Sequence, residues 1–91
     1  MESLNFFRIN KDGHVIGIYI DDPANLGIGI LPKQICTLKY LKDLLLANCE
    51  LSRIPEEIGL LASLRLLDLQ HNKIDIIPEH ISNIKKIKII K

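Results

Sequence analysis

Aliphatic residues recur along the chain at a fixed spacing of 23 positions. The pattern of one stretch is repeated in the next without a gap, and nine positions match in register. The first copy consists of Leu38, Leu41, Leu44, Leu46, Cys49, Leu51, Ile54, Pro55 and Ile58, and the second of Leu61, Leu64, Leu67, Leu69, Asn72, Ile74, Ile77, Pro78 and Ile81. Such a period indicates a repeat architecture, in which each unit buries its apolar face against its neighbours.

Two incomplete copies flank this pair. The upstream copy contains Val15, Ile18 and Ile20, then Ile28, Leu31, Pro32 and Ile35, and its first turn holds a three-residue insertion within residues 21–27. The downstream copy begins with Ile84, Ile87 and Ile89, after which the sequence ends.

Within each copy the pattern predicts a short strand followed by a short helix. Aliphatic residues alternate at period two in the pairs Ile18 and Ile20, Leu44 and Leu46, Leu67 and Leu69, and Ile87 and Ile89, so each pair lies on one face of a strand. The four strands are expected to stack in parallel. Pro55 and Pro78 each precede glutamates, as at a helix start, where proline has no amide to lose and acidic groups meet the positive end of the dipole.

The N-terminal segment predicts an antiparallel hairpin over residues 3–20. Phe6 and Arg8 alternate with Phe7 and Ile9, the residues 10–13 read Asn-Lys-Asp-Gly, and a second strand follows. We expect the outer strand to cover the first repeat.

The pattern LxxLxLxx(N/C)xL, followed by a segment that contains proline, resembles the 23-residue class of the leucine-rich repeat family. The resemblance covers residues 15–91. The resemblance implies an α/β fold: a right-handed β/α solenoid in a short horseshoe arc, with four parallel strands and the hairpin as N-terminal cap. It divides the chain into a cap strand and turn over 1–14 and repeats over 15–37, 38–60 and 61–83, with a partial repeat over 84–91. It also implies that Asn72 and Cys49 point inward at a turn and bond backbone amides there, which cysteine does only weakly.

Composition and charge narrow the function classes. Counting gives 17 Ile and 15 Leu among 91 residues, with 47% hydrophobic and 4% aromatic residues, which excludes intrinsic disorder. The apolar runs are too short for a membrane span. The net charge of +1 predicts no general attraction to nucleic acid or membrane. Residues 79–91 carry +4 − 1 = +3, so the C-terminal end is basic.

No catalytic, metal or cofactor site is indicated. The histidines His14, His71 and His80 form no HxxxH or HExxH pair, and the serines lack a nucleophile-elbow context. Residues 27–29 read Gly-Ile-Gly without the rest of a nucleotide loop, and Asp21 and Asp22 lack further oxygen ligands for a cation. We expect a non-enzymatic chain without cofactors or metals.

The two cysteines, Cys36 and Cys49, form no CxxC motif, and the first residues carry no secretory signal. We therefore expect buried structural thiols and a cytoplasmic chain.

The concave face of the implied solenoid is the predicted binding surface. Residues that alternate with the inward leucines form predicted rows across the strands: Tyr19, Leu45, Asp68 and Lys88 in one row, Gly17, Asp43, Leu66 and Lys86 in the next, and Asp21, Ala47, Gln70 and Ile90 in the third. The candidate partner-binding residues are Tyr19, Asp43, Leu45, Leu66, Asp68, Gln70, Lys86 and Lys88. Exposed leucines beside an aromatic ring are typical of an interaction surface, although scattered exposed leucines are also normal.

The C-terminal strand is a predicted open edge. Three interpretations remain: a homodimer about a two-fold axis through residues 80–91, a fragment of a longer array, or a frayed strand. The candidate self-association residues are Ile84, Ile87, Lys88, Ile89 and Ile90.

The sequence therefore favours a protein–protein interaction module that binds a protein or peptide on its concave face. The resemblance implies cytosolic scaffolds that engage signalling proteins such as small GTPases. The alternatives are self-assembly through the C-terminal edge, a fragment of a larger signalling scaffold, and binding of the basic C-terminal segment to acidic membrane or RNA, which the edge-strand interpretation disfavours.

Overall fold

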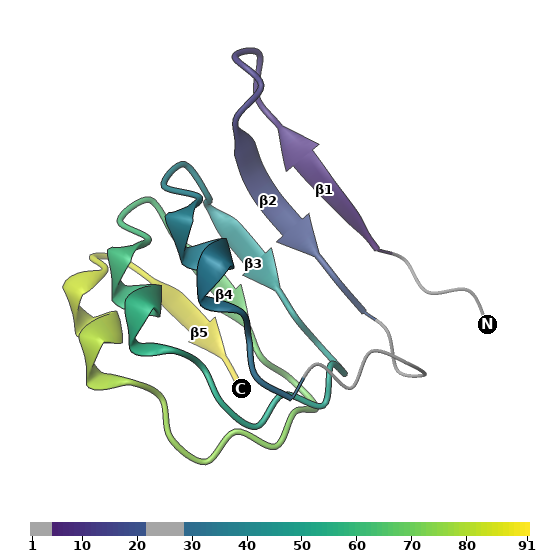
Figure 1. The fold of residues 1–91 in the computed structure, drawn as a ribbon, viewed down its shortest axis with the longest axis vertical. Coiled ribbons are helices and arrows are strands. Elements are labelled where there is room, and N and C mark those ends of the chain that lie inside the picture. The colour runs from purple at the N-terminus through teal and green to yellow at the C-terminus, as the bar shows by residue number, and fades with distance from the viewer. Residues whose placement is uncertain (1–4, 22–28) are drawn as a thin grey trace.

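A computed structural model describes residues 5–21 and 29–91, and in this part of the chain five strands form one mixed sheet (Figure 1). The strands lie in sequence order, and they are β1 Phe6–Ile9, β2 Val15–Tyr19, β3 Asp43–Leu45, β4 Leu66–Asp68 and β5 Lys88–Ile90. The β1–β2 pair is antiparallel, whereas β2–β3, β3–β4 and β4–β5 are parallel. The chain is therefore a small α/β protein in which helical segments alternate with strands.

Each helical segment is a short 3-10 helix that begins directly after a proline. The three are η1 Lys33–Thr37, η2 Glu56–Leu60 and η3 Glu79–Asn83, with Pro32, Pro55 and Pro78 at their N-caps. The prediction that helices start after Pro55 and Pro78 is confirmed. Five residues are enough for one or two 3-10 turns, whose rise per residue is greater than that of an α-helix, so each connection can return quickly to the sheet.

The core lies between the sheet and this layer of helices (Figure 1). It is built from the residues of the 23-residue pattern, and the leucines and isoleucines at positions 41, 44, 46, 51, 58, 61, 64 and 67 are completely buried. Ile18, Leu44, Leu67 and Ile89 face each other across neighbouring strands. Each repeat thus supplies side chains of similar size at equivalent positions of neighbouring strands, which permits the close packing of a protein interior.

A half-buried asparagine joins the turns of two successive repeats. The Oδ1 atom of Asn72 accepts hydrogen bonds from the backbone amides of Cys49 at 3.0 Å and Leu51 at 2.9 Å. Its Nδ2 group donates to the carbonyl oxygen of Leu46 at 2.8 Å and lies within hydrogen-bonding distance of two further carbonyls in its own turn. The predicted inward position of Asn72 is confirmed.

Cys49 occupies the corresponding position one repeat earlier. Its thiol lies 3.4 Å from the carbonyl oxygen of Ala47 and 3.8 Å from that of Ile20, so it makes the weak contacts expected of sulfur. Both Cys36 and Cys49 are buried thiols, as predicted.

The N-terminal hairpin forms as predicted, but its outer strand does not cover the core. Asn10 organises the turn, because its Oδ1 atom accepts hydrogen bonds from the amides of Asp12 and His14. All four residues of β1 are exposed, including Phe7 at 66%. The strand extends the sheet sideways beyond the helical layer instead of folding over the first repeat (Figure 1). The expectation of a covering strand is therefore wrong.

The register of β5 differs from the predicted one. Lys88 pairs with Leu66, Ile89 with Leu67 and Ile90 with Asp68, whereas the predicted rows placed Lys88 beside Asp68 and Lys86 beside Leu66. The connection into β5 is one residue shorter than the equivalent connection into β4. β4 starts five positions after Leu61, whereas β5 starts four positions after Ile84.

Lys86, which has a positive φ of 62°, lies in the turn that this shorter connection requires, so Lys86 is not part of the strand. Ile84 is 3% exposed and belongs to the core, so its predicted place on an accessible edge is also wrong.

Several predicted features lie outside the described residues. These are the first two residues of the predicted hairpin, most of the three-residue insertion, Asp22, and the first two residues of the Gly-Ile-Gly segment. Within the described ranges, no helix has the length and hydropathy to cross a bilayer.

Candidate functional site

The face of the sheet opposite the helices carries most of the predicted partner-binding residues. We call it the helix-free face and define it by the outward side chains of the five strands: Phe6, Arg8, Tyr19, Asp43, Leu45, Leu66, Asp68, Lys88 and Ile90. These residues alternate with the inward residues along each strand, so the pleat directs them to the same side.

Strand pairing arranges this face in two rows. One row runs through Arg8, Gly17, Asp43, Leu66 and Lys88, and the other through Phe6, Tyr19, Leu45, Asp68 and Ile90. The structure therefore brings together Tyr19, Asp43, Leu45, Leu66 and Asp68 as predicted, and it moves Lys88 into the row of Leu66. Gln70 follows β4 in a turn, and Lys86 precedes β5.

Tyr19 anchors the N-terminal side of the face. Its ring stacks on Phe6, with 4.5 Å between the ring centroids and 20° between the planes. Its hydroxyl donates a hydrogen bond of 3.1 Å to Oδ2 of Asp43 on the next strand. The ring also covers Gly17, which is buried although it lies on the outward side of β2. These contacts hold an aromatic platform in one orientation, which lowers the entropy that binding must overcome.

Asp43, Leu45, Leu66 and Asp68 form the centre of the face, and all four are half-buried. Asp68 accepts a hydrogen bond at Oδ1 from the backbone amide of Gln70 at 3.0 Å. In the part of the chain that the structure describes, neither aspartate forms an ion pair. The centre thus combines two aliphatic side chains with two carboxylates that keep accessible acceptor capacity.

Phe6 and Arg8 were not predicted as site residues. The alternation of residues 4–9 was visible in the sequence, and antiparallel pairing places Phe6 opposite Tyr19 and Arg8 opposite Gly17. The alternation shows that Phe6 and Arg8 share one face of a strand, but the predicted role of this strand is to cover the first repeat, not to extend the sheet.

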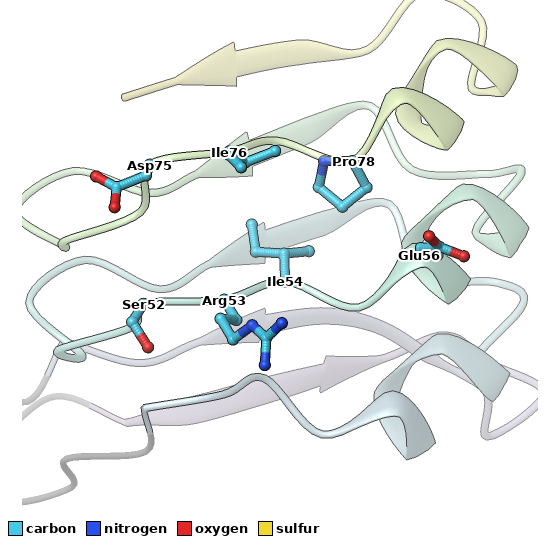
Figure 2. Close-up of a pocket in the computed structure, with 7 residues that line it drawn as sticks. All are labelled: Ser52, Arg53, Ile54, Glu56, Asp75, Ile76 and Pro78. Carbon is cyan, nitrogen blue, oxygen red and sulfur yellow. The ribbon is translucent and has the colours of Figure 1, made fainter.

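The described residues line several hollows outside this face, and two of them are relevant to function. One is an apolar groove on the helix side of the hairpin, lined by Asn5, Phe6, Phe7, Val15, Ile18, Ile20 and Leu38. The other lies between the extended segments that lead to η2 and η3, and Figure 2 shows Ile54 between the acidic side chains of Asp75 and Glu56 at its two ends. In this second hollow the hydroxyl of Ser52 donates to the carbonyl oxygen of Gly29, and no histidine is among the lining residues.

Neither hollow has a nucleophile with an adjacent base, the minimum for covalent or acid–base catalysis. Among the described residues, no group of three histidine, cysteine or acidic side chains is placed to hold a metal ion. Burial raises the pKa of the Cys36 thiol, and the carboxylate of Glu57 raises it further, so this thiol is not activated for nucleophilic attack.

Comparison with known families gives one match. Residues 63–84 match the model of the Leucine Rich Repeat, a segment that runs from just before β4 through η3. Searches of the curated proteins and of the solved structures found no match.

Proposed function

We propose that this chain, which belongs to the leucine-rich repeat family, binds a protein or peptide segment on its helix-free face. Repeats of this family generally mediate protein–protein interactions and are typically non-enzymatic. A stack of repeats creates an extended surface of strands, and partners are bound across it.

The observation that carries the proposal is the continuity of this face. Apolar side chains from four strands, Phe6, Tyr19, Leu45 and Leu66, lie in neighbouring positions of two adjacent rows. A contiguous patch of this kind on a protein surface is typical of an interaction site, and its charged neighbours provide a polar rim.

In the same proposal, the repeats over 15–37, 38–60, 61–83 and 84–91 form a short solenoid arc of four parallel strands. Residues 1–14 precede these repeats, and β1 within this segment pairs with the outer edge of β2. The pairing of β2 to β5 and the recurring proline-started helices support this division. We further propose a cytoplasmic setting, which two buried thiols suit, and signalling proteins such as small GTPases remain a partner class that the family resemblance suggests.

The test compares two leucine substitutions of the same chemistry. L45E places a charge in the middle of the helix-free face, whereas L60E places it on η2, where Leu60 is 68% exposed. Affinity-tagged wild type, L45E and L60E are used to recover partners from the source cells, and bound proteins are quantified by mass spectrometry. The proposal predicts partners that wild type and L60E recover equally and that L45E loses. Equal recovery by all three proteins contradicts it.

Self-association through β5 is a second candidate. Within the described residues, β5 pairs only with β4, so its outer backbone groups are available to another strand. In an antiparallel pair of two β5 strands centred on Ile89, each Lys88 would lie opposite an Ile90 instead of another lysine. A molecular mass of twice 10.3 kDa at micromolar concentration, reduced to the monomer mass by Ile89→Pro, supports this candidate, and a monomer throughout refutes it.

A further inference from the structure

Acidic and aliphatic side chains alternate at the centre of the helix-free face. Asp43 lies beside Leu66, and Leu45 lies beside Asp68, so the aspartates occupy one diagonal and the leucines occupy the other. Neighbouring strands lie about 4.8 Å apart, and diagonal neighbours lie about 7 to 8 Å apart. A single long side chain of a partner, lying along the diagonal between Asp43 and Asp68, can therefore reach both carboxylates.

The hydrogen bonds of the chain itself fix these carboxylates and leave acceptor capacity. The hydroxyl of Tyr19 donates a hydrogen bond to Oδ2 of Asp43, and the backbone amide of Gln70 donates one to Oδ1 of Asp68. Each of these contacts uses one oxygen, and a carboxylate has two oxygens with several acceptor positions. The acids are thus oriented before a partner arrives.

The basic residues of the face do not neutralise this centre. The register of β5 places Ile90 beside Asp68 and moves Lys88 to the side of Leu66. At the other edge, Gly17 stands between Arg8 and Asp43 in the row, so Arg8 and Asp43 are separated by two strand spacings, about 10 Å. The centre of the face thus carries two carboxylates, and its neighbours in the two rows are Gly17 and Tyr19 on one side and Lys88 and Ile90 on the other.

We infer that the helix-free face selects a segment in which an arginine is flanked by apolar side chains. This inference rests on the proposed function and specifies its partner. The guanidinium group lies between Asp43 and Asp68, because its fork of donors can bond two acceptors at once. Its aliphatic stem packs on Leu45 and Leu66, and an apolar neighbour of the arginine packs on Tyr19 and Phe6. Lysine binds more weakly because its ammonium group is a compact charge that loses more hydration.

The experiment is a selection of random ten-residue peptides displayed on phage, with the full chain as target. Four targets are used: wild type, D43N/D68N, E56Q/E79Q and L45K, in which the lysine opposes a bound arginine. The amide substitutions at 43 and 68 keep an oxygen acceptor for Tyr19 and Gln70 while they remove the charge. E56Q/E79Q removes the same charge from exposed positions of η2 and η3, away from the face.

The expected result is enrichment of peptides with arginine next to apolar residues on wild type and on E56Q/E79Q. This preference is lost on D43N/D68N, and the same peptides are not retained by L45K. For the most enriched peptide, made synthetically, replacement of its arginine by glutamine weakens binding about tenfold, and raising the salt concentration weakens binding of the arginine form more than that of the glutamine form.

The outcomes separate the inference from the function on which it rests. Peptides that depend on Leu45 but carry no basic residue overturn the arginine preference and leave the binding face in place. Peptides bound equally by wild type and L45K overturn the binding face itself, and so does a selection that enriches nothing over the empty support.

Discussion

The ring of Tyr19 occupies the space that a side chain at Gly17 would need. A Cβ atom built on Gly17 stands 2.6 Å from the hydroxyl oxygen of Tyr19 and 2.8 Å from a ring carbon. The two residues lie two positions apart on β2. The missing side chain at Gly17 leaves room for the ring of Tyr19 to lie flat on the sheet. The same placement lets the ring stack on Phe6 and its hydroxyl reach Asp43.

Gly17→Ala is therefore expected to displace the ring of Tyr19 while the strand stays intact, because the clash falls on the movable end of a side chain. The loss of one hydrogen bond and one ring stack predicts a decrease of about 1 to 2 kcal/mol in the free energy of unfolding, measured with urea. Tyr19→Phe is the matched control, since it removes only the hydroxyl and is expected to cost about 1 kcal/mol. Unchanged NMR shifts of the Tyr19 ring in G17A would contradict this account.

Asn72→Ala is expected to be the more damaging change. It removes the acceptor for the amides of Cys49 and Leu51 and the donor for the carbonyl of Leu46, so buried backbone groups lose their partners. We predict a loss of about 3 kcal/mol in the free energy of unfolding. Asn83→Ala, at an exposed position of η3, should change it by less than about 0.5 kcal/mol. Equal effects of the two substitutions would show that Asn72 does not connect the repeats.

At Gly59, η2 lies close against the backbone of η3. A Cβ atom at this position would stand 2.5 Å from the backbone carbonyl oxygen of His80, which cannot move aside like the end of a side chain. Gly59→Ala should therefore lower the free energy of unfolding by about 1 to 3 kcal/mol. Ser82→Ala introduces alanine at the equivalent position one repeat later and should be nearly neutral. A G59A protein as stable as wild type would mean that the helices can separate without cost.

The Cys36 thiol gives a prediction for alkaline pH. Burial, with the carboxylate of Glu57 as a second cause, raises its pKa, so less thiolate is present in the folded chain than in the unfolded chain. Alkylation of Cys36 by iodoacetamide at mildly alkaline pH should be slower in the folded protein and somewhat faster in E57Q, with E56Q as control. Mass spectrometry of separate tryptic peptides distinguishes Cys36 from Cys49.

The same shift makes stability depend on pH. Because the folded pKa of Cys36 lies above the unfolded one, its contribution to stability is complete below the unfolded pKa and is lost as pH rises through the folded pKa. Cys36→Ala should therefore flatten the decline of the unfolding free energy at alkaline pH. If the unfolding free energy of C36A declined by the same amount at alkaline pH, other titrating groups would be the cause.

Much of this architecture was predictable because the repeat is a local pattern with a fixed period. The inward positions, the proline-started helices and the role of Asn72 all follow from residues that recur every 23 positions. The centre of the helix-free face, from Tyr19 to Asp68, follows from the same period, since in-register strands place equivalent residues side by side.

The failures occur where the period breaks. A strict period of 23 would place Ile89 beside Leu66, and one residue fewer before β5 places Lys88 there. The predicted rows place Lys86 there because they match Ile87 and Ile89 to Leu67 and Leu69, although Lys86 has a left-handed backbone and lies in a turn. The position of β1 was missed for a different reason. Alternation along a strand shows its two faces but does not show whether it folds over a core or extends the sheet, which depends on tertiary packing.

The most direct test of the central claim is an NMR titration of the labelled chain with the most enriched phage peptide. The account predicts that the largest backbone amide shifts occur on the helix-free face, at Tyr19, Leu45 and Asp68. Largest shifts instead in the apolar groove around Phe7 and Leu38, or in the hollow around Ile54 and Ile76, would contradict it.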